Sequence, residues 1–254
     1  MFSSLHIHRL GEGLSACGAV EGEGAAGGKA ASARAAAEQL IEYARMIVKA
    51  NQRFNLTGAV SPDEIITRHL LDSAWGYGFL KRHGLAKGAA MDIGSGAGLP
   101  GVVWAVLGGF DRVVCCESVG KKADFIRASA KALGLAALEV ETRRAEELGR
   151  APAWRGQFDL VTARAVAPLS VLLELMAPLA RVGGVCFAFK GQAAQKEIGA
   201  AANAMSELRV TLERHERYEI PHSAHGGELL LFHKTAPTPA CYPRRPGLPK
   251  KKPL

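Results

Sequence analysis

The chain has 254 residues, of which 48% are hydrophobic and 22% are charged, a balance typical of a soluble globular protein. No apolar stretch is long enough to span a bilayer, and the N-terminus lacks the basic start and apolar core of a signal peptide. The five cysteines form no C-x-x-C pair, so we expect a reduced, cytoplasmic setting and no metal site.

Residues 1–30 are rich in glycine and alanine, and we expect them to be poorly ordered. Residues 31–87 read as a helical N-terminal region. An apolar stripe predicts a first helix from Ser32 to Asn51. A second helix begins at Ser61, which precedes a proline and stands three residues before Glu64, the spacing of a capping box. On that helix His69 and Asp72 share a face, and we expect them to fix the N-terminal helices against the sheet. A role of His69 as a catalytic base is the less favoured alternative.

Residues 88–240 alternate short apolar strands with helices, which indicates a mostly parallel sheet with helices on both faces. Near the end of this region, a strand over 228–233 is expected to pair with 210–214 or 217–220 as an antiparallel edge. The expected strands are Ala89–Ile93, Arg112–Glu117, Leu138–Glu141, Asp159–Thr162 and Val185–Phe189. The expected helices are Gly101–Leu107, Lys121–Leu133 and Leu169–Ala180.

The stretch DIGSGAGLPG, from Asp92 to Gly101, places four glycines between a predicted strand and a predicted helix. Glycine costs backbone entropy, which a ligand that approaches the backbone closely would justify. A flexible linker is the alternative, but linkers are polar and lack such close apolar flanks. The pattern favours a ligand-binding turn. Because Gly96, Gly98 and Gly101 also fit the dinucleotide spacing G-x-G-x-x-G, the glycines alone leave NAD open as the ligand.

In a parallel sheet the ligand lies at the carboxyl ends of the strands, so the residues there are the candidate site. Glu117 ends the second strand, 19 positions after Gly98, where a carboxylate can accept hydrogen bonds from ribose hydroxyls. NAD and S-adenosylmethionine both contain ribose. Asp92 beside the turn, where it can reach back to the loop and to an amino group of the donor, favours the methyl donor. So do the antiparallel edge and the helical region before the first strand.

The chain resembles the RsmG (GidB) family of bacterial small-subunit rRNA methyltransferases, which modify guanine at N7. The resemblance covers the chain from about Leu40 to the C-terminus. It rests on an ordered set of motifs: FNLT (Phe54–Thr57), RHLLDS (Arg68–Ser73), DIGSGAGLPG (Asp92–Gly101), ESVGKKADFI (Glu117–Ile126), RAE (Arg144–Glu146), FDLVTARAVAPL (Phe158–Leu169), KG (Lys190–Gly191) and YPRRPG with the basic run behind it.

The resemblance implies a class I, Rossmann-like methyltransferase fold, with S-adenosylmethionine as donor, S-adenosylhomocysteine as product and a guanine in the decoding region of 16S rRNA as acceptor. The substrate would be 16S rRNA or a small-subunit precursor. Carried over by position, the donor site comprises Asp92, Gly94, Gly96, Gly98, Leu99, Glu117, Ala145, Glu146 and Arg164. Glu117 stands where many relatives have aspartate, and Asp124 where a basic residue is common.

Guanine N7 carries a lone pair and no proton, so no general base is required and catalysis is mainly alignment. Arg164 and Lys190, at strand ends, are the candidate positioning residues, and the charge of Arg164 is expected to be paired with a carboxylate or an RNA phosphate. A ribose 2′-O-methyltransferase that uses Lys190 and Asp92 as base stays open. So does a non-catalytic nucleotide-binding regulator. We expect a monomer.

The net charge of +8 is uneven, because the tail, residues 241–254, contains five basic residues and no acid. Charge alone is consistent with RNA binding and with a disordered, solubilising tail. If the tail binds RNA, its removal should weaken RNA binding and leave donor affinity unchanged. The basic residues are Arg244, Arg245, Lys250, Lys251 and Lys252.

Overall fold

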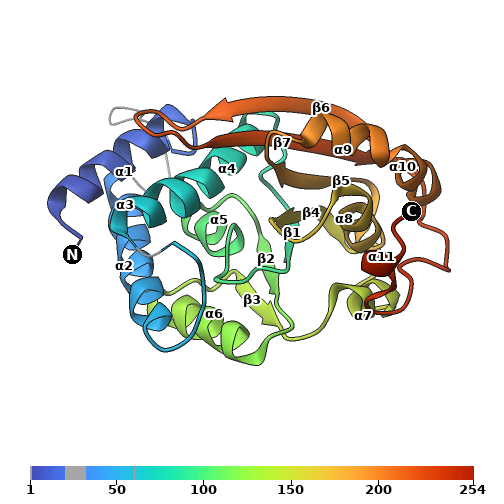
Figure 1. Cartoon of the computed structure of the whole chain (residues 1–254). Coiled ribbons are helices and arrows are strands. Elements are labelled where there is room, and N and C mark those ends of the chain that lie inside the picture. Colours follow the sequence, from blue (N-terminus) through green and yellow to red (C-terminus); the bar gives the residue numbers. More distant parts are fainter. Residues whose placement is uncertain (1, 21–32, 60) are drawn as a thin grey trace.

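A seven-stranded sheet forms the centre of the computed structural model, which describes residues 2–20, 33–59 and 61–254 (Figure 1). The strand order is β3-β2-β1-β4-β5-β7-β6. Within the described residues no helix is both long and apolar enough to cross a bilayer. The strands are β1 (Ala89–Ile93), β2 (Arg112–Cys116), β3 (Leu138–Glu141), β4 (Phe158–Arg164), β5 (Ala180–Lys190), β6 (Val210–Glu219) and β7 (Gly226–Lys234).

Strands β1 to β5 are parallel, and β7 runs antiparallel between β5 and β6. The antiparallel edge is therefore confirmed. Its outer strand is a single element, β6, which covers both candidate segments and has a register shift between Leu212 and Arg214. The strand order reverses between β1 and β4, the point at which such sheets bind ligands.

Helices cover both faces of the sheet, and alternate residues of each strand enter two separate cores. On β1, Ala90 packs into the core beneath α5 and α6, whereas Met91 packs into the core beneath α7, α8 and α10. The predicted fold class is therefore confirmed. These helices are α5 (Gly101–Leu107), α6 (Gly120–Ala132), α7 (Ala145–Arg150), α8 (Leu169–Met176), α9 (Ala194–Ala200) and α10 (Ala202–Leu208).

The N-terminal helices extend the core that lies beneath α5 and α6. Helix α2 (Ala33–Asn51) matches the predicted first helix. The second predicted helix starts at the Ser61 capping box as α3 (Pro62–Ile65), passes through a π-helical segment, η1 (Ile66–Leu71), and continues as α4 (Asp72–Arg82). A π-helical turn inside an α-helix is frequently found at a functional site.

The prediction that residues 1–30 are poorly ordered is wrong for residues 2–20, the part of this segment that the structure describes. Helix α1 (Ser4–Ala16) packs on α2, and its Leu10 and Leu14 are fully buried. Gly78 of α4 permits this packing, since a Cβ there would lie 1.9 Å from the Cys17 carbonyl oxygen. Leucines spaced four apart bury one face of α1, which the glycine-rich composition concealed. Residues 21–30 lie outside the described residues.

The C-terminal tail is also ordered, contrary to the solubilising interpretation. It runs back across the body of the protein, and helix α11 (Leu248–Lys251) lies near α7 and α8 (Figure 1). The reason is a buried partner: the Glu174 side chain is fully buried and forms an ion pair of 2.5 Å with Arg244.

Candidate active site

The glycine turn leads from β1 into α5 at the switch point of the sheet. Gly96 has φ +58°, and a Cβ built on it would meet nothing closer than 3.9 Å. Its open side faces a cavity. Gly101 has another role, because a Cβ there would lie 2.4 Å from Cys115 Sγ. Gly98 is equally confined, with Val102 at 2.6 Å. The turn therefore leaves the side of Gly96 open, whereas close packing requires glycine at Gly98 and Gly101.

Asp92 lies beneath this turn. Its carboxylate accepts a hydrogen bond of 3.0 Å from the Gly101 N–H, as expected for a residue that reaches back to the loop. The side chain is 1% exposed, and Oδ1 has no hydrogen-bond partner among the residues that the structure describes. Burial raises the pKa of Asp92 to about 7. Asp92 supports the turn from below and lines neither of the cavities described next.

Two neighbouring cavities lie at the carboxyl ends of the strands. The loop cavity, of about 450 Å³, is lined by Leu56, Thr57, Arg68, His69, Asp72, Gly94, Ser95, Gly96, Ala97, Leu99, Glu117, Lys122, Arg164 and Ala165. The tail cavity, of about 210 Å³, is lined by Ile93, Gly94, Cys116, Ser118, Arg143, Arg144, Ala145, Glu146, Val166, Ala167, Val171, Leu175, Gly247, Pro249 and Lys250. Gly94 lines both and joins them.

Glu117 follows β2 and is 7% exposed. Its carboxylate accepts hydrogen bonds of 2.8 Å from the N–H groups of Gly96 and Val119. These two bonds fix the carboxylate beside the glycine turn, at the wall of the loop cavity. Ala145 and Glu146, which the family resemblance places beside a bound adenine, line the tail cavity.

Arg164, the last residue of β4, is held by the N-terminal helical region. Its guanidinium donates to the Asp72 carboxylate at 2.7 Å and to the Arg68 carbonyl at 2.9 Å. The Tyr218 hydroxyl donates to the other oxygen of Asp72. The side chain of Arg164 is 14% exposed. As expected, the charge of Arg164 is paired with a carboxylate, and the partner comes from the N-terminal region.

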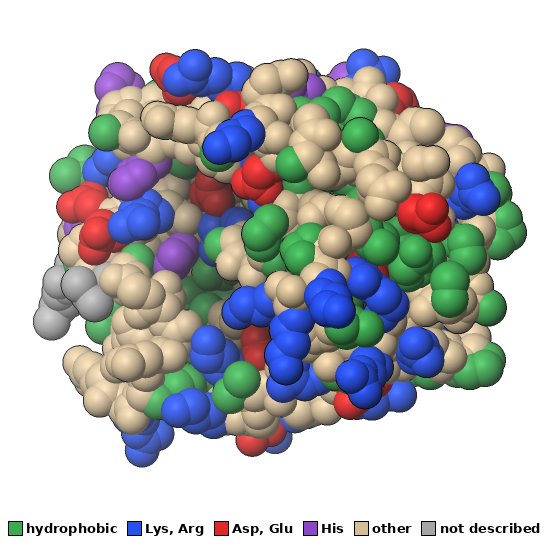
Figure 2. All heavy atoms as spheres, turned by 45° about the vertical axis from the view of Figure 1, so that its right-hand side comes forward, with side chains coloured by type: hydrophobic (Ala, Val, Ile, Leu, Met, Phe, Trp, Pro, Cys, Tyr) green, Lys and Arg blue, Asp and Glu red, His purple; other side chains and the backbone are tan. Residues whose placement is uncertain are grey.

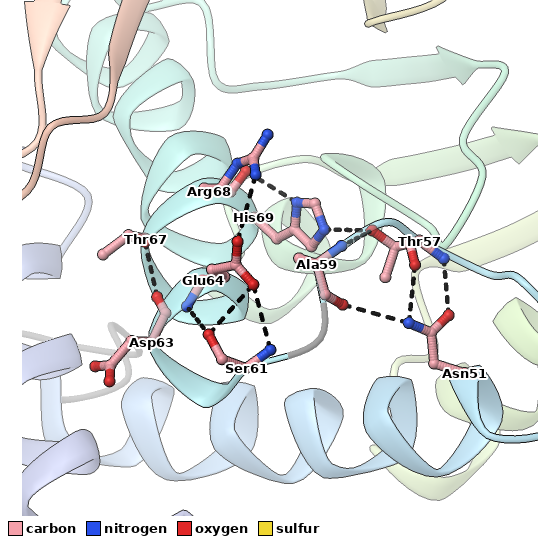
Figure 3. A network of polar contacts seen from close by, with 9 residues as sticks. All are labelled: Asn51, Thr57, Ala59, Ser61, Asp63, Glu64, Thr67, Arg68 and His69. Atoms are coloured by element: carbon pink, nitrogen blue, oxygen red, sulfur yellow. Dashed lines mark hydrogen bonds and ion pairs between the residues drawn. The ribbon is translucent and has the colours of Figure 1, made fainter.

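His69 belongs to the π-helical segment and is hydrogen-bonded to Thr57 at 2.5 Å (Figure 3). The loop that carries Thr57 is in turn held by the Asn51 side chain, which bonds to the backbone of residues 56, 57 and 59. Burial, with the nearby charge of Arg164, lowers the pKa of His69 to about 4. His69 is therefore neutral near pH 7. It contacts the sheet through Arg164, because a guanidinium nitrogen of Arg164 lies 3.4 Å from His69 Nδ1.

Lys190 is not placed in either cavity. Its ammonium lies 2.7 Å from the Glu197 carboxylate and donates to the Ala167 carbonyl at 3.0 Å. Only 8% of the side chain is exposed. Lys190 was expected to face the mouth of the pocket because it ends β5, but Glu197 of α9 holds it against the loop that follows β4.

Several cavity residues were missed as site residues. Thr57, Arg68 and Asp72 line the loop cavity from the N-terminal region, although the sequence assigned that region only a packing role. Gly247, Pro249 and Lys250 line the tail cavity from a segment that was expected to bind only RNA. The polar spacing in RHLLDS was a usable signal, whereas nothing in the tail sequence pointed to a cavity wall.

Basic residues surround the mouth of the tail cavity. Figure 2 shows Lys and Arg side chains gathered on the face that comes forward from the right-hand side of Figure 1, where α7 and α11 lie. Arg143, Arg144 and Lys250 line the cavity itself, and Arg245, Lys251 and Lys252 are exposed. Arg244 differs from its neighbours, because its guanidinium is engaged by the buried Glu174.

The sheet order, the glycine turn at its switch point and the acid that follows β2 define a class I methyltransferase. Solved structures support this fold assignment. The ribosomal protein L11 methylase of Lactobacillus delbrueckii subsp. bulgaricus aligns with a TM-score of 0.50 at 16% identity, over 66% of this chain and 79% of that one. A branched-chain polyamine synthase variant from Thermus thermophilus aligns with a TM-score of 0.55 at 16% identity, over 76% and 63%.

The chain belongs to the GidB family, described as rRNA small subunit methyltransferase G, whose family model matches residues 36–223. It is 40% identical over 223 residues to the ribosomal RNA small subunit methyltransferase G of Symbiobacterium thermophilum, covering 85% of this chain and 89% of that protein. The protein of the same name from Roseiflexus castenholzii is 41% identical over 222 residues, covering 85% and 91%. The predicted family is thus confirmed.

Proposed function

We propose that this protein transfers a methyl group from S-adenosylmethionine to N7 of a guanine in the decoding region of bacterial 16S rRNA. Its relatives carry the name of ribosomal RNA small subunit methyltransferases. The observation that carries the proposal is the loop cavity, which combines an open glycine cradle, a fixed carboxylate and a guanidinium locked by Asp72.

The residues present fit the donor. The open side of Gly96 leaves room for a ligand against the backbone. Glu117, already oriented by two N–H groups, has lone pairs left for ribose hydroxyls. Ala145 and Glu146 in the adjoining tail cavity would flank the adenine, and Leu99 and Arg164 would lie beside the methionine part. S-adenosylmethionine, when bound, supplies an electrophilic methyl group.

The chain's own residues are expected to act by alignment. Guanine N7 bears a lone pair and no proton, so the site needs no general base, and His69 with its lowered pKa is not one. A target base must leave its stack to be methylated. Arg164, anchored at two points, would position that base or a flanking phosphate.

The position of Lys190 disfavours ribose 2′-O methylation. That reaction would need Lys190 and Asp92 to act on one hydroxyl. Asp92 is buried beneath the turn and Lys190 is bonded to Glu197, and neither lines the loop cavity. N7 methylation, which requires neither residue, is therefore the better supported reaction.

The proposed substrate is 16S rRNA or a small-subunit precursor, which the protein would meet in the cytoplasm as a monomer. The exposed basic residues at the mouth of the tail cavity would bind phosphates of that RNA.

Calorimetry with S-adenosylmethionine, S-adenosylhomocysteine and NAD tests the donor part of the proposal. We expect both sulfur compounds to bind and NAD to give no heat of binding. If NAD binds and neither sulfur compound does, the glycine turn is a dinucleotide-binding turn and the donor part of the proposal is wrong. Donor binding without methyl transfer to RNA would favour the non-catalytic regulator.

A further inference from the structure

The C-terminal segment is attached to the body by carbonyl groups upstream of α11. The Arg155 guanidinium donates to the carbonyls of Thr238 and Tyr242 at 2.7 Å each, and Arg150 donates to the Pro243 carbonyl at 2.7 Å. Both arginines lie in or just after α7, beside the tail cavity. They fix the path of the chain up to residue 243.

The next attachment is an ion pair between Arg244 of the C-terminal segment and Glu174 of α8. One carboxylate oxygen of Glu174 accepts hydrogen bonds from the backbone N–H of Arg244 at 2.8 Å and from its Nε at 2.9 Å. The other accepts from a terminal nitrogen of the same guanidinium at 2.5 Å. Because the Glu174 side chain is fully buried, this two-point contact leaves the segment little freedom to lift away.

Beyond that anchor the segment becomes a wall of the tail cavity. The Gly247 N–H donates to the Glu146 carboxylate at 3.1 Å, and Gly247, Pro249 and Lys250 line the cavity. Glu146 is only 8% exposed, so the segment contributes to covering it. The cavity thus has the ends of β1 and β2 and the start of α7 on one side, and the C-terminal segment on another.

We propose that residues 244–251, here called the C-terminal strap, close the adenine subsite through Gly247, Pro249 and Lys250, and that the Arg244–Glu174 ion pair sets donor affinity. The inference rests on the proposed function, which assigns the tail cavity to the adenine. The strap covers the subsite and holds the carboxylate of Glu146, so an unanchored strap would leave the adenine partly in water. Arg244 is a positioning residue, since it acts through the strap.

The strap revises the expectation that loss of the tail leaves donor affinity unchanged. Gly247, Pro249 and Lys250 of the strap line the cavity, whereas Arg245 and Lys251 of the same segment face solvent. Removing the segment would therefore open the donor site as well as remove basic residues.

Calorimetry with S-adenosylhomocysteine, without RNA, tests the strap in the full-length protein. We expect Arg244→Ala to weaken binding about tenfold, within the usual range for coupling between separate sites. The matched control is Arg245→Ala, which removes the same charge from the neighbouring exposed position. We expect it to change this affinity by less than about twofold. Equal affinity of wild type and Arg244→Ala would overturn the inference, whereas failure of the wild type to bind would instead contradict the proposed function.

Because Arg244→Ala leaves Glu174 buried without its partner, a second measurement keeps the test independent of folding in that variant. Trypsin cuts the wild-type chain between Arg244 and Arg245 only if Arg244 leaves Glu174, so cleavage at this bond reports detachment of the strap. Saturating S-adenosylhomocysteine should slow this cleavage at least about fivefold, because the ligand binds only the closed strap. Cleavage at the same rate with and without ligand would overturn the inference.

Discussion

In the proposed reaction, alignment in the loop cavity depends most on Arg164, because Asp72 and the Arg68 carbonyl fix its guanidinium at two points. We expect Arg164→Ala to lower the single-turnover methylation rate about 100-fold, the size of loss that misplaced reactants produce. Donor affinity should change less than about fivefold, since the interaction that this variant removes belongs mainly to the reacting complex. Rapid-quench methylation at saturating donor measures the first quantity, and calorimetry measures the second.

Asp72→Asn is the companion variant, because it keeps the shape of the carboxylate and removes the charge that holds Arg164. It should reproduce part of the loss in rate. A methylation rate in Arg164→Ala equal to that of the wild type would show that Arg164 does not align the reactants.

Gly96 should be the position at which an added side chain blocks the donor. Gly96→Val would project into the open side of the turn and should abolish donor binding in calorimetry, while strain at φ +58° should cost about 1–3 kcal/mol of stability. Gly134→Val is the control, since Gly134 has φ +66°, has nothing within 4 Å and lies between α6 and β3, away from both cavities. Equal donor affinities in the two variants would contradict this role for Gly96.

Asp92 should give the protein an unusual pH dependence. Burial raises its pKa from 3.8 to about 7, so in that interval the folded state holds a proton that the unfolded chain releases. The stability that this proton provides is full below the unfolded pKa and is lost as the pH rises through the folded pKa. Relative to Asp92→Asn, the wild type should lose on the order of 3 kcal/mol from pH 4 to 7. Urea unfolding of both proteins measures this, and parallel pH profiles would contradict it.

At the residue scale, local pattern in the sequence located part of the lining of the two cavities. Gly96, Glu117 and Ala145 follow strand ends, and the ends of parallel strands meet at one edge of a sheet. It could not predict that Glu197 engages Lys190, or that Asp72 reaches Arg164 from 92 residues away. Such contacts depend on how distant elements dock, which local spacing does not encode.

Helix α1 is the element on which sequence and structure differ most. Leu14 is fully buried, whereas Leu5 on the same helix is 69% exposed. Leu14→Ala should therefore reduce the free energy of unfolding by about 2–5 kcal/mol. Leu5→Ala should change it by less than about 0.5 kcal/mol. Urea denaturation measures both, and equal effects would mean that α1 does not pack as described.

The elements that the sequence located well are the ones with strong patterns: the strands of the sheet, α2 and the capped start of α3. Helices α1 and α11 were missed for a physical reason. Helix α1 contains Gly11 and Gly13, and α11 has only four residues and contains a proline. Each is stabilised by burial against distant parts of the chain more than by its own propensity.

At the scale of the whole molecule, the proposed RNA-binding surface is the group of exposed basic residues near the C-terminus. Lys251→Gln with Lys252→Gln should weaken binding of 16S rRNA fragments and reduce the slope of log affinity against log salt by about 0.7 to 0.9 for each phosphate that the variant no longer binds. Donor affinity should stay unchanged, because neither residue lines the tail cavity. The control pair, Lys87→Gln with Lys131→Gln, lies at the amino end of the strands. A filter-binding salt series that gives the same slope for both pairs would contradict a basic RNA surface at the tail.

Methyl transfer to ribosomal RNA tests the central claim most directly. Small ribosomal subunits whose 16S rRNA lacks the modification would be incubated with the protein and isotopically labelled S-adenosylmethionine, and the RNA would be digested for nucleoside mass spectrometry. We expect labelled N7-methylguanosine from a single guanine in the decoding region and no labelled 2′-O-methyl nucleoside. A label on ribose, or no label on the RNA from protein that binds the donor normally, would contradict it.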